Sequence, residues 1–156
     1  MEHILVSACL LGMSCRYDGR SKANETIVKL LEDENICLIP VCPEQAGGLA
    51  TPRVPSEIRG DRVINQEGQD VTAQYQKGAE EALRLAGLYH CGLAILKERS
   101  PSCGCGQIYD GSFTKTLVAG DGRTAALLKE KGINVVGESD ILKDQEGTAI
   151  WNAKKK

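Results

Sequence analysis

The sequence has no strong excess of charge of either sign. Its 19 Lys and Arg residues are nearly balanced by 21 Asp and Glu residues, which gives a formal net charge of −2. Proteins that bind duplex DNA usually carry a basic excess or a basic stripe. Here the basic residues are scattered, and their only run is the three lysines at 154–156, which we expect to be a frayed, solvated end. We therefore predict no DNA-binding surface.

Long hydrophobic runs are also missing. No apolar stretch approaches the ~20 residues that a membrane-spanning helix needs. The residues before Cys9 resemble a lipoprotein cleavage site, but the short segment ahead of that cysteine includes Glu2 and His3. A secretion signal needs a basic start and an apolar stretch of ~7–15 residues. We therefore expect a cytoplasmic protein with no membrane partner.

Several familiar binding motifs are absent. Residues 104–106 are not a dinucleotide fingerprint, and residues 45–48 lack the lysine and hydroxyl of a P-loop. The two histidines, His3 and His90, stand outside any motif, so we expect both to be structural. No internal repeat, low-complexity tract or linker interrupts the chain, and its length predicts one domain spanning residues 1–156.

Short apolar runs alternate along the chain with helical patterns. The runs predict buried strands at residues 4–7, 36–41, 93–96 and 133–136, and the patterns predict helices at 24–34, 70–87 and 124–131. Strands that alternate with helices are typical of parallel strands joined by right-handed crossovers. The expected fold is therefore α/β, a three-layer Rossmann-like fold with a mainly parallel sheet and long loops at the carboxyl ends of the strands.

Details of the helices and loops can also be predicted. In the first helix, Asn24 is the expected cap, and Ile27, Val28 and Leu31 are the expected buried face. The second helix places Tyr75 on its apolar side and ends at Gly87, a typical stop.

Two long segments, residues 43–69 and 98–123, are irregular and rich in Gly, Pro, Ser and Thr. Loops of this length in a compact domain are usually functional. Within the second segment, residues 107–113, centred on Asp110–Gly111, are predicted to form a small hairpin.

Seven cysteines are many for a reducing compartment, and an odd number does not suit a disulfide framework. Cys9 follows the first predicted strand, Cys42 follows the second, and Cys103 lies in the loop after the third. Ligands of open α/β sheets bind beyond the carboxyl ends of the strands. We therefore expect these three thiols to meet at one edge of the sheet.

Thiolates that converge need positive charge beside them, which a metal supplies. Soft thiolate ligands select iron–sulfur clusters, zinc or copper(I). A structural zinc site and an electron-transfer cluster each take four ligands. A [4Fe–4S] cluster with three cysteine ligands instead leaves one iron open to act as a Lewis acid.

The residues around these cysteines form four motifs, which resemble those of a bacterial family that was long called only a domain of unknown function. The family includes thiouracil desulfidase, and the resemblance covers roughly residues 3–145 in the same order. We expect the short, single-domain form of this family. The motifs are Ser7-Ala8-Cys9-Leu10-Leu11-Gly12, Arg16-Tyr17-Asp18-Gly19, Cys42-Pro43-Glu44 and Glu98-Arg99-Ser100-Pro101-Ser102-Cys103-Gly104.

The resemblance implies that Cys9, Cys42 and Cys103 bind a [4Fe–4S] cluster with one open iron. It also implies that this iron takes the sulfur of a thiolated nucleobase such as 2-thiouracil, and that Glu44 and Ser102 contribute to catalysis. We expect Glu44 to act as general acid or base and Ser102 to orient the base by hydrogen bonding. Sulfur would leave as hydrosulfide without net electron transfer, as in a C–S hydrolysis.

The other four cysteines have different expected places. Cys37 is predicted to be buried in the core and Cys91 to lie in the core or near the surface, and Cys15 is interpreted as a bystander near the first motif. Cys105 is a candidate fourth ligand or sulfur relay. Two alternative functions follow: a cluster-dependent sulfur transferase that uses Cys105 or Cys15, and a zinc-binding or redox-sensing module without catalysis.

Charged residues near the motifs allow further hypotheses. Glu98 and Arg99 are expected to pair structurally, and residues 16–18 are expected to shape a turn into Gly19. Arg53 is a candidate for either a substrate contact or a structural role. The natural substrate and the oligomeric state do not follow from the sequence.

Overall fold

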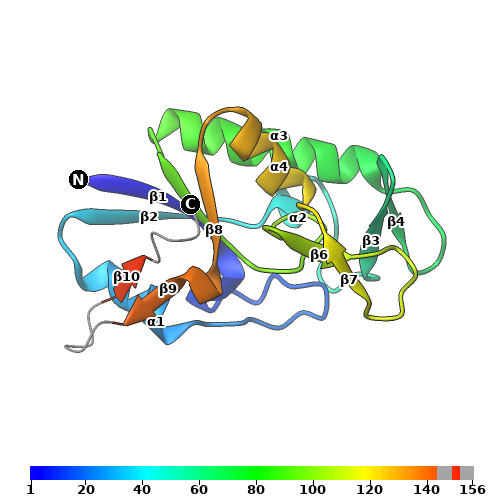
Figure 1. Cartoon of the computed structure of the whole chain (residues 1–156), viewed down its shortest axis with the longest axis horizontal. Helices are drawn as coiled ribbons and strands as arrows, with labels where there is room; N and C mark the ends of the chain where they lie inside the picture. Colours follow the sequence, from blue (N-terminus) through cyan, green and yellow to red (C-terminus); the bar gives the residue numbers. More distant parts are fainter. Residues whose placement is uncertain (144–148, 152–156) are drawn as a thin grey trace.

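The computed structural model describes residues 1–143 and 149–151, so the lysines at 154–156 lie outside it. Its central sheet has four strands in the order β2-β1-β5-β8, and every neighbouring pair is parallel (Figure 1). These strands are β1 (Glu2–Ser7), β2 (Ile36–Val41), β5 (Leu93–Leu96) and β8 (Asn134–Gly137). All four predicted strands are confirmed, and so is the mainly parallel α/β fold.

The strands are apolar on both faces because each face of the sheet is covered. Along β1, Ile4 and Val6 belong to one core cluster, whereas Leu5 between them belongs to another. Alternate side chains of a strand point to opposite faces. A run of consecutive apolar residues is therefore what a strand buried on both faces requires.

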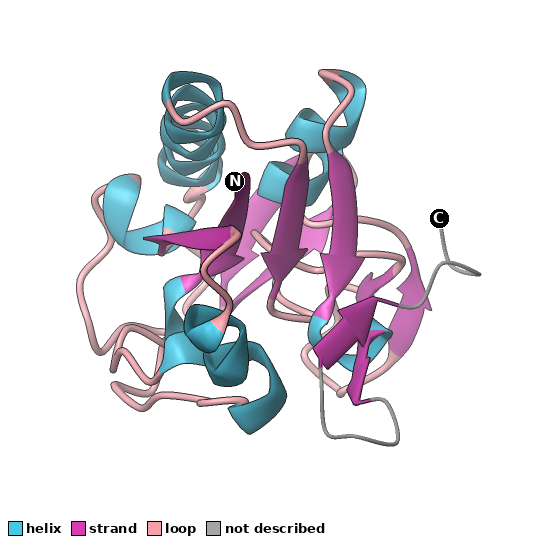
Figure 2. Cartoon of the chain, turned by 90° about the vertical axis from the view of Figure 1, so that its left-hand side faces the viewer, coloured by secondary structure: helices cyan, strands magenta, loops and turns pink. Residues whose placement is uncertain are grey.

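Helices lie on both faces of the sheet and complete three layers (Figure 2). One face is covered by α3 (Thr72–Leu88) and α4 (Arg123–Glu130). The other face is covered by α1 (Glu25–Val28) and by two 3₁₀ helices, η1 (Ala8–Leu11) and η2 (Lys29–Glu32). The predicted three-layer arrangement is confirmed.

Two helix predictions need correction. Asn24 caps α1 as expected, since its side chain accepts a hydrogen bond from the Ile27 amide at 3.2 Å. After Val28, however, the chain tightens into the 3₁₀ helix η2, which has three residues per turn. Leu30 therefore lies in line with Ile27 and is buried, whereas Leu31, predicted to be buried, is 56% exposed. The helix α3 runs through Gly87, the predicted stop, to Leu88.

Short elements that were not predicted lie in the first irregular segment and near the end of the chain. Residues 43–69 include α2 (Pro43–Ala46) and a hairpin of β3 (Ser56–Arg59) and β4 (Arg62–Asn65). Near the end of the chain, β9 (Ile141–Lys143) pairs with β10 (Ala149–Trp151). These elements are too short for periodicity to reveal.

The hairpin predicted at residues 107–113 exists, but its turn is wider than expected. Its strands are β6 (Gln107–Tyr109) and β7 (Leu117–Ala119), which leaves a loop at residues 110–116. The wide loop is closed at its ends by the Asp110 amide, which donates to the Thr116 carbonyl. Across the loop, the hydroxyls of Ser112, Thr114 and Thr116 form a chain of hydrogen bonds.

None of the helices in the described residues has the length and apolar character needed to cross a membrane.

Candidate active site

A cavity of about 490 Å³ lies beyond the carboxyl ends of β1, β2 and β5. The strand order reverses at β1, since β2 lies on one side of it and β5 on the other. Such a switch point is the usual ligand site of an open α/β sheet. The thiol-bearing residues that line the cavity are Cys9, Cys15, Cys42 and Cys103. The structure thus brings the three predicted ligands to one cavity, together with a fourth cysteine.

Each predicted ligand follows a strand through a tight local structure. Cys9 lies in η1, where Gly12 ends the 3₁₀ turn with a φ of 100°. Cys42 immediately precedes α2, whose first residue is Pro43. The amide of Cys103 donates to the Ser100 hydroxyl at 3.0 Å, which fixes the loop after β5.

Cys15, interpreted from the sequence as a bystander, lines the same cavity as the three predicted ligands. Its thiol is buried and hydrogen-bonds with the thiols of both Cys42 and Cys9. The Cys42 thiol also donates to the Cys15 carbonyl at 3.6 Å. The signal in the sequence was Gly12, which turns the chain so that a cysteine six residues after Cys9 returns to it.

The remaining cysteines do not line the cavity. The Cys105 thiol donates to the Val135 carbonyl at 3.4 Å and lies near the Lys129 ammonium. Cys91 is buried in the core on the α3 side of the sheet, and Cys37, predicted to be buried, is half-buried against the same cluster. Neither role predicted for Cys105, fourth ligand or sulfur relay, is favoured by its position.

Among the cavity thiols, those of Cys42 and Cys103 have a raised pKa in the absence of a cation. Burial raises the pKa of Cys103 to about 12. The pKa of Cys42 is raised by its hydrogen bond with Cys15 and then by burial. Within the described residues, no three His, Cys, Asp or Glu side chains lie close enough to share one metal ion. An iron–sulfur cluster distributes its thiolate ligands over separate irons, so this spread set of soft donors fits a cluster.

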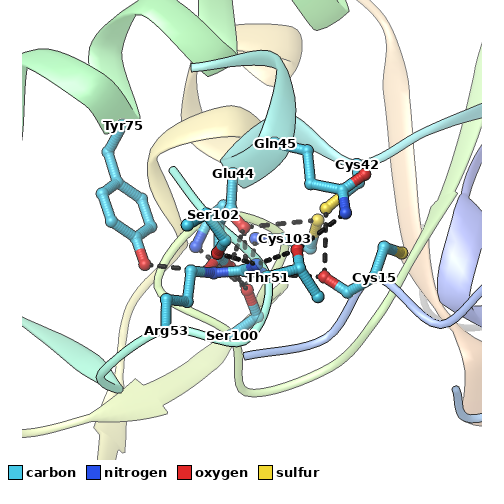
Figure 3. A network of polar contacts seen from close by, with 11 residues as sticks. Cys15, Cys42, Glu44, Gln45, Thr51, Arg53, Tyr75, Ser100, Ser102 and Cys103 are labelled. Carbon is cyan, nitrogen blue, oxygen red and sulfur yellow. Dashed lines mark hydrogen bonds and ion pairs between the residues drawn. The ribbon is translucent and has the colours of Figure 1, made fainter. Parts of the chain in front are cut away.

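Glu44 occupies the centre of a hydrogen-bond network beside these thiols (Figure 3). Its Oε1 accepts from Arg53 Nε and from the Tyr75 hydroxyl, both at 2.9 Å. Its Oε2 accepts from the Ser102 hydroxyl at 2.9 Å and from the Ser100 hydroxyl at 3.4 Å. An ionised carboxylate has room for about four such donors. The network therefore holds Glu44 in one position on α2.

Ser102 lies between Glu44 and a predicted cluster ligand. Its hydroxyl oxygen is 2.9 Å from Glu44 Oε2 and 3.6 Å from the Cys103 sulfur, although the hydroxyl has only one proton to donate. The start of α4 fixes its backbone, since the Thr124 amide donates to the Ser102 carbonyl at 2.8 Å. A Cβ at Gly122 would lie 2.5 Å from that carbonyl, so only glycine permits this approach.

Arg53 is held entirely by protein groups. Besides Glu44, its guanidinium donates to the Cys15 carbonyl at 2.9 Å, the Ala50 carbonyl at 3.1 Å and the Thr51 hydroxyl at 3.0 Å. Burial alone lowers its pKa, but the charge of Glu44 and their hydrogen bond outweigh burial and leave the pKa raised. The geometry favours the structural interpretation of Arg53, as the residue that ties Glu44 to the Cys15 segment.

Tyr75 was predicted only as a buried position of its helix. Its ring is buried, as expected, and its hydroxyl also reaches Glu44. Burial raises the pKa of Tyr75, and the negative charge of Glu44 raises it further. The phenol therefore stays protonated and donates. Periodicity identifies the buried face of a helix but does not indicate where a hydroxyl on that face points.

Two close helix contacts place Glu44. A Cβ at Gly47 would lie 2.0 Å from the Gln74 carbonyl, and a Cβ at Gly78 would lie 1.9 Å from the Pro43 carbonyl. The short helix α2 thus packs with its backbone directly against α3. Because Tyr75 also lies on α3, this contact sets the distance between its hydroxyl and Glu44.

The other charged motifs are partly as expected. The Gly19 amide donates to the Arg16 carbonyl and the Arg20 amide to the Asp18 carboxylate, so the predicted turn forms. Within the described residues, however, no ion pair joins Glu98 to Arg99. The Glu98 carboxylate instead accepts from the Ser139 amide at 2.7 Å, so the predicted pairing is wrong.

Comparison with known proteins agrees with this geometry. The family described as 2-thiouracil desulfurase matches residues 4–140. The chain belongs to this family. Among solved structures, the [4Fe–4S]-dependent thiouracil desulfidase TudS superposes with a TM-score of 0.82 at 47% identity, over 90% of this chain and 93% of the TudS chain. The resemblance predicted from the four motifs is therefore confirmed.

The uncharacterized protein YbbK of Bacillus subtilis (strain 168) is 42% identical over 148 residues, which cover 88% of this chain and 97% of YbbK. Membership of the family and the similarity to TudS support an enzymatic activity, the desulfuration of thiouracil.

Proposed function

We propose that this protein hydrolyses the C=S bond of a thiolated nucleobase such as 2-thiouracil, using a [4Fe–4S] cluster held by Cys9, Cys42 and Cys103. One observation carries the proposal: three thiols from three strand ends share a cavity with the Glu44–Ser102 hydrogen bond. The dependence of the similar protein TudS on a [4Fe–4S] cluster supports the choice of metal group.

The cluster would supply a Lewis-acidic iron with affinity for sulfur at the cavity. The overall reaction is a substitution of oxygen for sulfur, in which C=S and water give C=O and hydrogen sulfide. Atoms and electrons balance without an oxidant or reductant. The chain itself must therefore supply a group that takes a proton from water and a group that orients the ring.

Glu44 suits the proton-transfer role. Its carboxylate lies beside the thiols, and four donors hold it in place. A positioned carboxylate of this kind can take a proton from an attacking water and return it to a ring nitrogen or to sulfur. Ser102 would pass its single proton between Glu44 and the substrate, because its hydroxyl lies beside both Glu44 and Cys103.

The two alternative functions are less well supported. A sulfur relay through Cys105 is disfavoured because that thiol does not line the cavity, so any relay would have to use Cys15. A single-zinc module is disfavoured because no three candidate ligands of the described chain approach one point.

The test begins with anaerobic reconstitution with iron and sulfide. The expected product is a brown protein that releases hydrosulfide and uracil from 2-thiouracil. Cys9→Ser, Cys42→Ser and Cys103→Ser should each lose most of the bound iron, whereas Cys105→Ser should keep both iron and turnover. A colourless protein with stoichiometric zinc would contradict the proposal.

Glu44 has its own test. Glu44→Gln removes the charge and the proton-accepting capacity but keeps the size of the side chain. We expect turnover to fall by a factor of about 100 or more, while iron content stays near that of the wild type. Full turnover in a fully loaded Glu44→Gln protein would remove Glu44 from the mechanism.

A further inference from the structure

Two hairpins outside the central sheet lie against each other, β3–β4 and β6–β7 (Figure 1). A buried carboxylate from β3 joins them. Glu57 Oε1 accepts from the Gly111 amide at 2.9 Å and from the Phe113 amide at 3.1 Å, both in the loop between β6 and β7. Among the described residues no cation forms an ion pair with this carboxylate, so its hydrogen bonds serve the loop.

A second residue of β3 strengthens the attachment. Arg59 Nε donates to the Gly111 carbonyl at 2.7 Å. A Cβ at Gly111 would lie 2.6 Å from Arg59 Cγ and 2.9 Å from the Ile58 carbonyl, and the φ of Gly111 is 94°. The loop at residues 110–116 therefore packs closely against β3, and only glycine fits at position 111.

The backbone of this loop is strained. Phe113 has a φ of 59° and Lys115 a φ of 60°, the left-handed region that side chains other than glycine rarely adopt. Such strain persists only where the surroundings over-determine the conformation, and it is common at ligand-binding sites. The two hydrogen bonds to Glu57 supply that constraint, because one of them is made by the amide of Phe113 itself.

The strained residues face the candidate active site. Phe113 and Lys115 both line the cavity that contains Glu44 and the four thiols, and Glu57 lines it too. Phe113 is the only phenylalanine in the chain. The Arg59 guanidinium lies 5.7 Å from the centroid of its ring, which orients the ring on one side.

We propose that the loop at residues 110–116 is the substrate-binding wall of the cavity, that Phe113 stacks on the flat heteroaromatic ring, and that Glu57 is the positioning residue that presents Phe113. The proposal rests on the proposed function, since a planar base is the ligand that an aromatic face suits. It predicts that Phe113 and Glu57 control substrate binding rather than the chemical step.

The test compares variants of the reconstituted protein with 2-thiouracil as the probe. Phe113→Leu should raise KM about 10-fold with kcat and iron content near the wild-type values, and Phe113→Tyr should restore KM. Glu57→Ala should raise KM similarly. Glu57→Gln should preserve it, because the amide oxygen still accepts both backbone N–H groups. Val118→Ala, on the exposed side of β7 and off the cavity, is the control.

Hydrogen exchange gives a readout independent of turnover. Glu57→Ala should speed amide exchange in residues 110–116 relative to the wild type, and Glu57→Gln should not. The proposal is overturned if Phe113→Leu leaves KM unchanged, or if it lowers kcat while KM stays constant. Either result would leave the proposed desulfuration activity standing.

Failure of the proposed function would look different. A wild-type protein that carries a cluster yet neither turns over nor binds 2-thiouracil overturns the function, and the substrate wall with it. Loss of exchange protection in Glu57→Ala would then still be seen, since it depends only on the contact between the hairpins. If Glu57→Ala does not fold, Phe113→Leu and Glu57→Gln decide the question.

Discussion

Two serines share Glu44 as a partner but differ in their other contacts, although only one residue separates them. Ser102 directs its hydroxyl toward Glu44 and Cys103. The Ser100 hydroxyl lies farther from Glu44, at 3.4 Å, and also accepts from the amides of Ser102 at 3.1 Å and Cys103 at 3.0 Å, which closes a local turn. At the scale of single residues, one hydroxyl is placed for proton transfer and the other for loop structure.

This division gives a first prediction. Ser102→Ala should lower kcat for 2-thiouracil by about 10-fold or more while iron content and Tm stay close to wild type. Ser100→Ala should lower the midpoint of urea unfolding and reduce iron retention, because the loss of its acceptor leaves two amides unpaired, a cost of about 1–3 kcal/mol. If Ser102→Ala and Ser100→Ala lose the same amount of iron and have the same kcat, the two hydroxyls do not have separate roles.

At the scale of elements, the contact between α2 and α3 determines where Glu44 lies. Gly78→Ala places a Cβ 1.9 Å from the Pro43 carbonyl, and backbone cannot yield as a flexible side chain does. We expect a loss of about 1–3 kcal/mol in the free energy of unfolding. Turnover should fall as well, because α2 carries Glu44.

The matched control for Gly78 is in the same helix. A Cβ at Gly87 would meet no atom within 4 Å. Gly87→Ala should therefore leave turnover unchanged and stabilise the protein by about 0.4–1 kcal/mol, since alanine restricts the unfolded chain. Urea unfolding and hydrosulfide release measure both variants. If Gly78→Ala and Gly87→Ala have the same stability and turnover, the contact between α2 and α3 does not determine the position of Glu44.

The start of α3 gives a prediction about pH. The pKa of Asp70 is lowered from 3.8 to about 2 by hydrogen bonds from the Thr72 side chain and backbone and from Arg62. A carboxyl whose pKa is lower in the folded state stabilises the fold when ionised. This contribution is complete above 3.8 and is lost as the pH falls toward 2.

Asp70→Asn keeps an acceptor for the Thr72 amide but removes the charge. Its Tm should be below that of the wild type at about pH 6, and the difference should shrink as the pH falls below about 4. The pair is exposed, so the effect is expected to be small. Glu80→Gln, on the exposed side of α3, controls for loss of one negative charge. A Tm difference that stays constant with pH would contradict the assignment.

At the scale of the whole molecule, patterns of apolar residues determined the sheet. The four strands and the two long helices were predictable because burial on both faces of a sheet, or on one face of a helix, imposes a periodicity. The turn of the first helix into a 3₁₀ helix was not predictable, and it moved burial from Leu31 to Leu30. The short hairpins and α2 also lacked enough residues to establish a period.

The candidate site likewise has features that the sequence predicted and features that it did not. The order of strands and cysteines was enough to place Cys9, Cys42 and Cys103 at one sheet edge, because parallel strands have their carboxyl ends at the same edge. Their role as ligands, the catalytic roles of Glu44 and Ser102, and the single-domain organisation remain predictions. The Glu98–Arg99 pairing was wrong, and the place of Cys15 in the cavity was not predicted, because each depends on the path of a loop.

The sequence by itself determined the α/β class, the family and the edge of the sheet where the thiols meet, because local periodicity and motif order are properties of the chain. Only the tertiary structure decided that Cys15 joins the cavity, that Tyr75 and Arg53 hold Glu44, and that Glu57 attaches the loop carrying Phe113. These contacts join segments far apart in the chain, and their side chains meet only after the sheet and helices have packed.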